Sequence, residues 1–172
     1  HLAAERALVN ELTTMLKVQP DQLAERVSKL AADLKDAERR LAQARTKELF
    51  AQVDQIVETM APAGKFDLVS AKVPGVTGGD LRSLATQIRS KIAERPAVVV
   101  LIGGTDDKPA MIVATTESAR AAGAKAGALI KVGISRLDGR GGGKDDMAQG
   151  AGSNASGVDD ALSTVASELS AL

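Results

Sequence analysis

The sequence predicts an α+β protein: a long antiparallel helical hairpin of coiled-coil type, followed by a small globular domain with a mixed β-sheet flanked by helices. Two observations favour this fold class. All 16 glycines lie after residue 60, and glycine is unfavourable inside helices. The later residues alternate apolar runs of strand length with segments of helical periodicity, a pattern typical of packed α and β layers. We therefore expect a helical connector at residues 1–61 and a globular domain with a glycine-rich loop at residues 62–172.

The connector is expected to contain two helices of unequal length. Leu2, Val9 and Leu16 recur every seven residues and predict a first helix of about four turns. Pro20 marks the turn that follows it. The second helix carries apolar residues in alternating steps of four and three, the spacing of a coiled-coil seam: Leu23, Val27, Leu30, Leu34, Ala37, Leu41 and Ala44. It is expected to run to about Ala61, so part of its seam extends past the shorter helix and requires a partner.

The globular domain is expected to combine three strands with three helices. The strands are predicted from the apolar, β-branched runs KFDLVSAKV (residues 65–73), PAVVVLIGG (96–104) and PAMIVATT (109–116). The last two form a hairpin across the turn GTDDK, whose paired carboxylates are better explained by a turn than by a metal site. Helical spacing of apolar residues predicts helices over residues 77–94, 126–137 and 158–169. The first of these begins T-x-x-D, with Thr77 as N-cap and Asp80 in the place of a capping-box partner.

Composition excludes several classes of function. The chain has no cysteine and a single histidine, His1, so neither a thiolate or histidine metal centre nor a Ser-His-Asp triad can be assembled. The absence of cysteine fits a reducing cytoplasm. No apolar run approaches the ~20 residues of a membrane span, so no membrane partner is expected. Since no nucleophile–base pair emerges either, we expect no catalytic residue, no bound metal and no cofactor.

The stretch GRGGGKDDMAQGAG, residues 139–152, is the most unusual part of the chain. It holds six glycines, and residues 120–144 leading into it carry six basic side chains against Asp138 alone. Successive glycine N–H groups can form a concave anion-binding nest, so a phosphate-binding loop is one interpretation and a solvated surface loop is the other. The spacing of a Walker-type nucleotide site is absent, because Asp145 stands where a hydroxyl belongs. Net charge is zero and Phe50 and Phe66 are the only aromatic residues, so recognition by base stacking has little to use.

The stretch GALIKVGISRLDGRGGGKDDMAQGAG closely resembles the C-terminal segment of bacterial alanyl-tRNA synthetase. In that family a helix leads into a glycine loop, G-G-(K/R)-G-G-G-(R/K)-x-D-M-A-Q. The matching residues are Gly139, Arg140, Gly141, Gly142, Gly143, Lys144, Asp146, Met147, Ala148 and Gln149. Asp138 replaces the leading glycine and Asp145 a frequent proline. The resemblance extends over the chain: residues 2–43 look like the connector after the editing domain, and residues 69–92 like the entry to the globular part.

The resemblance implies a non-catalytic module of that ligase, with a DHH-associated fold. In the family this region contacts the outer corner of tRNA, where the D- and T-loops meet, and helps one tRNA serve both aminoacylation and editing. The implied partners are tRNA(Ala), the aminoacylation and editing domains of the synthetase, and in some members a second copy as a homodimer. The expected RNA-binding residues are Lys131, Arg136, Gly139, Arg140, Gly141, Gly142, Gly143, Lys144 and Gln149.

Two alternatives remain open at this point. The hairpin and the domain could serve mainly a structural role in dimerisation, as the uncovered heptad seam suggests. The chain could also be the substrate-binding part of a DHH-family phosphodiesterase, which uses a related glycine loop. In those enzymes a histidine follows the glycines, whereas Lys144 stands in that place here, and no Asp-His-His metal centre is present.

Overall fold

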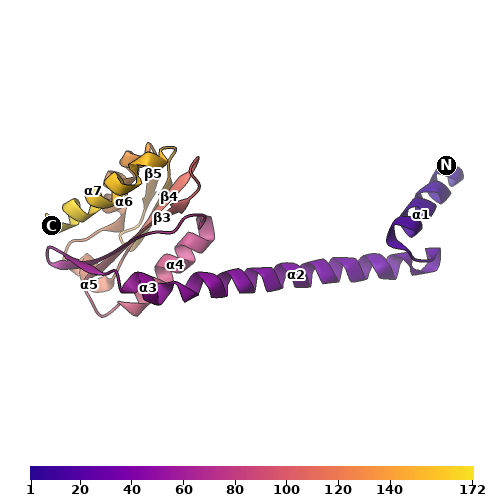
Figure 1. Ribbon diagram of the computed structural model, residues 1–172, viewed down its shortest axis with the longest axis horizontal. Helices are drawn as coiled ribbons and strands as arrows, with labels where there is room; N and C mark the ends of the chain where they lie inside the picture. The colour runs from indigo at the N-terminus through magenta and orange to yellow at the C-terminus, as the bar shows by residue number, and fades with distance from the viewer. The chain divides into compact units, whose positions relative to one another are not determined.

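The computed structural model describes residues 1–172, which form two compact units, His1–Lys47 and Glu48–Leu172. Figure 1 shows the order of elements along the chain, with helices first and the β-sheet afterwards. The units divide before the change of composition near residue 61, because Leu49, Val53 and Ile56 are buried in the core of the second unit.

The first unit consists of helix α1 (Leu2–Leu16), a short 3-10 turn (Pro20–Gln22) and the first part of α2 (Leu23–Ala51). Lys17 ends α1 in the left-handed conformation, and Pro20 opens the 3-10 turn, so both predicted helices and their connecting turn are present. The two helices do not pack side by side as the hairpin interpretation requires. Helix α1 buries no residue, and Leu8 and Leu34 are more than half exposed. The apolar seam therefore stays open to solvent within this chain.

The second helix ends earlier than predicted. Helix α2 stops at Ala51 and a short helix, α3 (Val53–Val57), follows, whereas the pattern had suggested one helix to Ala61. Residues Ala61–Ala63 instead form strand β1. Pro62 explains why helical structure does not extend to Ala61, because it has no N–H to donate to a helix and disfavours helical backbone at the residue before it.

The second unit is built on a six-stranded mixed sheet in the order β1-β2-β3-β4-β6-β5. Its strands are β1, β2 (Phe66–Lys72), β3 (Ala97–Gly104), β4 (Pro109–Thr115), β5 (Arg140–Gly143) and β6 (Met147–Ala151). Strands β2 and β3 are parallel, joined through a helix, and all other neighbours are antiparallel. The predicted hairpin of β3 and β4 is confirmed, and Thr105 and Lys108 exchange backbone hydrogen bonds across its turn.

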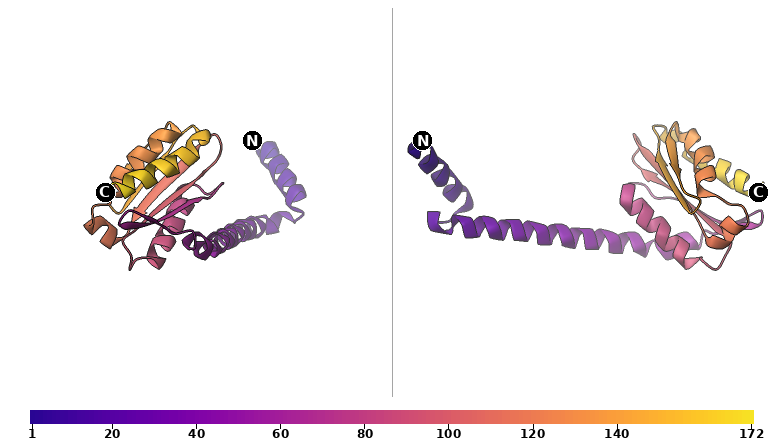
Figure 2. Two further views of the ribbon diagram at one scale, coloured as in Figure 1. Left: turned by 60° about the vertical axis from the view of Figure 1, so that its left-hand side comes forward. Right: turned by 180° about the vertical axis from the view of Figure 1, so that it is seen from behind.

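Helices cover both faces of this sheet. They are α4 (Gly78–Lys91), α5 (Glu117–Ala121), α6 (Ala126–Ile134) with the 3-10 turn Ser135–Leu137, and α7 (Val158–Ser170) after the 3-10 turn Ala155–Gly157. Figure 2 shows α4 against one face and α6 with α7 against the other. Thr77 is the N-cap of α4 as predicted, but its side chain accepts no capping hydrogen bond, so the capping box is not formed. The predicted fold class, helices followed by a mixed sheet with flanking helices, is confirmed.

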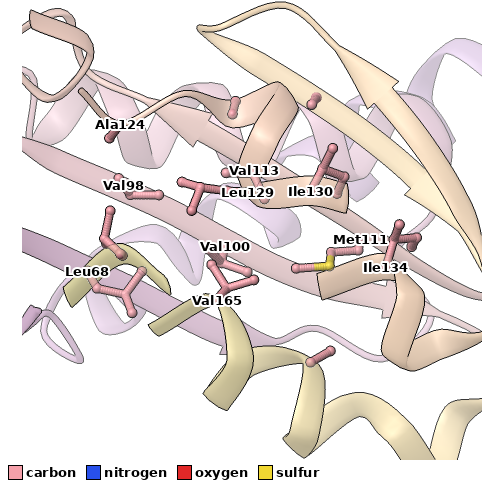
Figure 3. Packing of buried hydrophobic residues seen from close by; sticks show 14 of the residues in the cluster. Leu68, Val98, Val100, Met111, Val113, Ala124, Leu129, Ile130, Ile134 and Val165 are labelled. Atoms are coloured by element: carbon pink, nitrogen blue, oxygen red, sulfur yellow. The ribbon is translucent and has the colours of Figure 1, made fainter. Parts of the chain in front are cut away.

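Because both faces are covered, the central strands are apolar on both sides. Val98 and Val100 of β3 point toward α6 and α7, while Val99 and Leu101 point toward α4. Figure 3 shows the first of these two cores, where Leu129, Ile130 and Ile134 of α6 meet Met111 and Val113 of β4, with Val165 of α7 beside them. All eight residues of β3 and all seven of β4 are buried, which makes this pair of strands the rigid centre of the domain.

Thr116, the N-cap of α5, ties the start of β3 to the start of α5. Its side chain is buried, and its hydroxyl donates to the carbonyl oxygen of Arg95 at 2.6 Å and accepts from the N–H of Ala97 at 3.0 Å and of Ala119 at 3.4 Å. We predict that Thr116→Val lowers the free energy of unfolding by about 1–3 kcal/mol, because it leaves buried backbone groups without a partner. Thr116→Ser, which keeps the hydroxyl, should lose clearly less. Chemical denaturation measures both, and equal losses would contradict the assignment.

Candidate nucleic-acid interface

The glycine-rich stretch is a β-hairpin, which corrects the expectation of a loop. Strands β5 and β6 pair antiparallel from Arg140–Ala151 to Gly143–Ala148, and the N–H of Lys144 donates to the carbonyl oxygen of Met147 at 3.0 Å. Asp145 and Asp146 form the tip. None of the glycines in residues 139–152 has positive φ, so the backbone does not form the anion-binding nest that was one interpretation.

Asp138 occupies the left-handed position that ends the preceding helix, with φ 51°. The next N–H, from Gly139, donates to the carbonyl oxygen of Ile134 at 3.1 Å, which is a helix C-terminal capping arrangement. Glycine is favoured at such a position and Asp tolerates it better than most residues. The departure of Asp138 from the family pattern therefore falls on a helix end and leaves the hairpin itself unchanged.

The glycines are required by the close approach of neighbouring backbones. A Cβ atom on Gly150 would lie 2.6 Å from the carbonyl oxygen of Arg140, and one on Gly141 would lie 2.8 Å from the Cα of Gly150. A Cβ on Gly127 of α6 would lie 3.1 Å from the carbonyl oxygen of Gly143, so the start of the helix packs closely on one face of the hairpin. Gly142 differs, because no atom lies within 4 Å of the place its Cβ would take.

Strand alternation sorts the hairpin residues onto two faces. Gly143 pairs with Ala148, which belongs to the core under α6. Gly142 therefore faces the opposite side, together with its partner Gln149, whose amide donates to the carbonyl oxygen of Gly78 on α4 at 3.2 Å. Arg140, two residues before Gly142, shares that side. Lys144 follows β5 at the turn, where it lines an open surface pocket with Glu117 and Arg120 of α5. The structure thus brings two predicted polar residues, Arg140 and Gln149, onto the same side of the sheet as α4.

Strand β5 is also an edge of the sheet. Residues whose backbone bonds to β6 alternate with residues whose N–H and C=O point outward. Because Lys144 bonds to Met147 of β6, the outward amides are those of Gly141 and Gly143. An exposed edge usually binds another strand unless it is blocked; here it presents amides without side chains, between two cationic residues.

The predicted site residues do not form one cluster. Lys131 is an exposed residue of α6, and Arg136 lies in the 3-10 turn after it, with its guanidinium 3.5 Å from the carboxylate of Asp160. Both belong to the helical layer on the opposite face of the sheet from Arg140 and Gln149. The basic approach to the glycines in the sequence is therefore divided between two faces in the fold.

Two arginines of α4 were missed by sequence reasoning. Arg89 donates through Nη1 to the carbonyl oxygen of Asp146 at 3.0 Å, 57 residues away in the chain, and Arg82 is exposed on the same helix. Their separation of seven residues was a usable signal, because residues at that spacing lie on nearly the same side of a helix. Only the sheet order reveals that this side is next to the hairpin.

No group of three or more His, Asp or Glu side chains is arranged to hold a metal ion. None of the helices has both the length and the apolarity needed to cross a bilayer. The fold and the hairpin define a class: a three-layer α+β domain whose glycine-rich edge strand is flanked by basic side chains. The chain belongs to the DHHA1 domain family, which matches residues 66–171.

Comparison with known proteins confirms the resemblance to the C-terminal region of alanyl-tRNA synthetase. The chain is 74% identical over all 172 residues to an alanine–tRNA ligase of Cutibacterium acnes and spans 19% of that protein's length. The C-Ala domain of alanyl-tRNA synthetase from Aquifex aeolicus superposes with a TM-score of 0.60 at 25% identity, covering 65% of this chain and 98% of that one. RecJ from Thermus thermophilus, with a TM-score of 0.53 and 15% identity, covers 95% of this chain and 28% of its own, which shows a shared fold alone.

The division of the glycines into crowded and open positions can be tested by stability measurements. We predict that Gly150→Ala lowers the free energy of unfolding by about 1–3 kcal/mol, because the new methyl group would force β5 away from β6. Gly142→Ala is the matched control, since it meets no atom within 4 Å. It should be neutral or stabilise by up to ~1 kcal/mol through the lower entropy of the unfolded chain. A similar loss for both variants, measured by thermal or urea unfolding, would contradict this division.

Proposed function

We propose that this chain is a non-catalytic, tRNA-binding module of an alanyl-tRNA synthetase. In this proposal it contacts the elbow of tRNA(Ala), where the D- and T-loops meet, and helps one bound tRNA reach both the aminoacylation and the editing domains. It would act in the cytoplasm as part of the ligase. The observation that carries the proposal is the β5–β6 hairpin, whose open glycine edge lies between Arg140 and Lys144.

The chemistry of this edge suits a sugar-phosphate backbone. Arg140 and Lys144 are four strand residues apart, about 13 Å, and the outward amides of Gly141 and Gly143 lie between them. Guanidinium, ammonium and backbone N–H groups are the common donors to phosphate oxygens. Because glycines bear no side chains, a phosphate can approach the amides closely.

The kind of recognition also fits the composition. The only aromatic residues are Phe50 and Phe66, and Phe66 is buried at 2% exposure, so single-stranded bases find almost no stacking partners. Folded RNA is recognised largely by its shape and through contacts to phosphates and 2′-hydroxyl groups. The elbow of tRNA is a folded corner of this type.

Dimerisation through the first unit is a second candidate, favoured by one observation. Large apolar side chains of the heptad seam remain exposed, among them Leu34 at 61% and Leu41 at 53%. An apolar stripe at coiled-coil spacing is ordinarily covered by another helix. This role is compatible with RNA binding, since the seam lies on α2 in the first unit and the hairpin lies in the second.

The seam can be tested without RNA. If a second copy covers it, sedimentation of the chain at micromolar concentration should show a dimer, and Leu34→Glu should shift the species to a monomer, because burying an unpaired charge in a helical interface is costly. Lys35→Glu serves as the control, because it introduces the same acidic side chain at the neighbouring exposed position outside the seam. It should leave the dimer intact. If the unmodified chain sediments as a monomer, a second copy does not cover the seam, and other parts of a larger protein would have to cover it.

The RNA-binding role predicts a specific loss in the double variant Arg140→Ala, Lys144→Ala. Removing two phosphate contacts should weaken binding to tRNA(Ala) and lower the slope of log affinity against log salt by about 2. Lys29→Ala, Lys35→Ala makes the same change in net charge on the exposed surface of α2 and should leave both quantities nearly unchanged. Fluorescence anisotropy over a salt series measures them.

The choice of RNA decides whether the elbow is the contact. Full-length tRNA(Ala) should bind more tightly than an acceptor-stem minihelix, which lacks the D- and T-loops. Equal binding to both RNAs would mean generic attraction by basic residues. An affinity and a salt slope that the double variant leaves unaltered would remove Arg140 and Lys144 from the site.

A further inference from the structure

The flank of α4 that faces the hairpin can be identified from contacts at both of its ends. At its start, the carbonyl oxygen of Gly78 accepts a hydrogen bond from Gln149 of β6 at 3.2 Å. Toward its end, Arg89 donates to the carbonyl oxygen of Asp146 in the β5–β6 turn at 3.0 Å. With 3.6 residues per turn, Arg82 lies about 40° around the helix from Gly78 and about 20° from Arg89. Arg82 therefore belongs to the same flank, between the two contacts.

The opposite flank of α4 has a different neighbour. Lys91 forms an ion pair with Asp54 of α3 at 2.5 Å, so that side of the helix faces the layer over β2. Asp80, about 200° around the helix from Gly78, is also on that side. The flank directed at the hairpin consequently carries Arg82 and Arg89 without an acidic residue of α4 beside them.

On this side of the sheet the edge strand is exposed at Gly142. Helix α4 packs on β3 and β4 and reaches β6 along its near flank, where Met147 is buried in the α4 core and Gln149 bonds to Gly78. The absence of any atom within 4 Å of the Cβ position of Gly142 is consistent with an open surface there. On the other side of the sheet α6 lies directly on β5, with a Cβ on Gly127 only 3.1 Å from the carbonyl oxygen of Gly143. One side of the hairpin is accessible to a large ligand and the other is occupied.

The cationic side chains on the two sides of the hairpin also differ in their ion pairing. The side chains of Arg82, Arg140 and Lys144 form no ion pair in the structure. Arg89 lies 3.8 Å from the carboxylate of Asp146, a distance at the limit of an ion pair. On the α6 side Arg136 is paired with Asp160 at 3.5 Å, while Lys131 forms no ion pair. Unpaired cations attract a polyanion more strongly than cations that already have a counter-charge.

We propose that the tRNA backbone is bound on the α4 side of the hairpin, by Arg82 and Arg89 of α4 together with Arg140, over the open surface at Gly142, with Lys144 at the turn as the end of the contact. Lys131 and Arg136, on the α6 side, lie outside this contact. The inference rests on the proposed function and assigns to it one of the two faces of the sheet. It also adds Arg82 as a contact residue that is more than fifty positions from the glycine stretch.

A matched pair of charge reversals tests the choice of face. Arg82→Glu and Lys131→Glu change the net charge equally, at exposed helix positions without an ion-pair partner. Arg82→Glu should weaken binding of full-length tRNA(Ala) at low salt by at least about tenfold, since a phosphate contact is replaced by repulsion. Lys131→Glu should stay within about twofold, because only long-range attraction changes. Arg82→Lys should restore most of the affinity.

A second measurement does not depend on the stability of the charge variants. The chain has no cysteine, so Gly142→Cys and Lys131→Cys each provide one attachment site for a photoactivatable crosslinker. Crosslinking to bound tRNA is expected from position 142 and not from position 131. Crosslinks from position 131 alone would overturn the assignment.

The outcomes separate this inference from the proposed function. If the unmodified chain fails to bind tRNA, the proposed function fails and the inference fails with it. If the chain binds tRNA but Arg82→Glu binds as well as the unmodified chain, or Lys131→Glu loses as much as Arg82→Glu, the α4 face is wrong while the module remains an RNA binder.

Discussion

The position of the β5–β6 turn is the constraint on which the rest of the site depends. The carbonyl oxygen of Asp145 accepts hydrogen bonds from the N–H of Ala126 at 2.9 Å and the hydroxyl of Thr115 at 2.6 Å. The carbonyl oxygen of Asp146 accepts from the N–H of Thr115 at 3.0 Å and from Arg89 at 3.0 Å. Two carbonyl groups thus join β4, the start of α6 and the end of α4. Each neutral bond contributes about 0.5–1.5 kcal/mol, and together they hold the hairpin in one register.

This register explains why the edge strand is nearly free of side chains. Once β6 is aligned on β4, one face of β5 lies against the start of α6, where a Cβ on Gly127 would approach the carbonyl oxygen of Gly143, and within the hairpin the backbones of Gly141 and Gly150 approach closely. Glycine is the residue that permits such an approach. Close backbone packing requires glycines in β5, and glycines leave the outward amides of this edge strand without side chains around them. The same residues therefore serve the fold and the proposed contact with RNA.

The proposed interface, a few phosphate contacts on a chain of zero net charge, suits a tethered module better than an independent binder. The chain has 22 basic and 22 acidic residues, so its long-range attraction to RNA is small and depends on how charges are distributed over its surface. When such a module is linked to another RNA-binding domain, its binding becomes intramolecular and benefits from a high effective concentration.

The sequence by itself determined the local structure. Apolar runs predicted β2, β3 and β4, helical spacing predicted α4, α6 and α7, and the glycine motif with Arg140 and Lys144 indicated the family, because each of these signals depends on neighbours along the chain. The end of α2 at Ala51, the hairpin form of residues 139–152 and the separation of Lys131 and Arg136 from Arg140 were decided only by the tertiary structure. Strand alternation assigns residues to opposite faces only when the register is known, and here the register depends on Arg89 and Thr115, distant in sequence. The position of Arg82 beside the hairpin was also decided by the tertiary structure, because it depends on how α4 packs on the sheet.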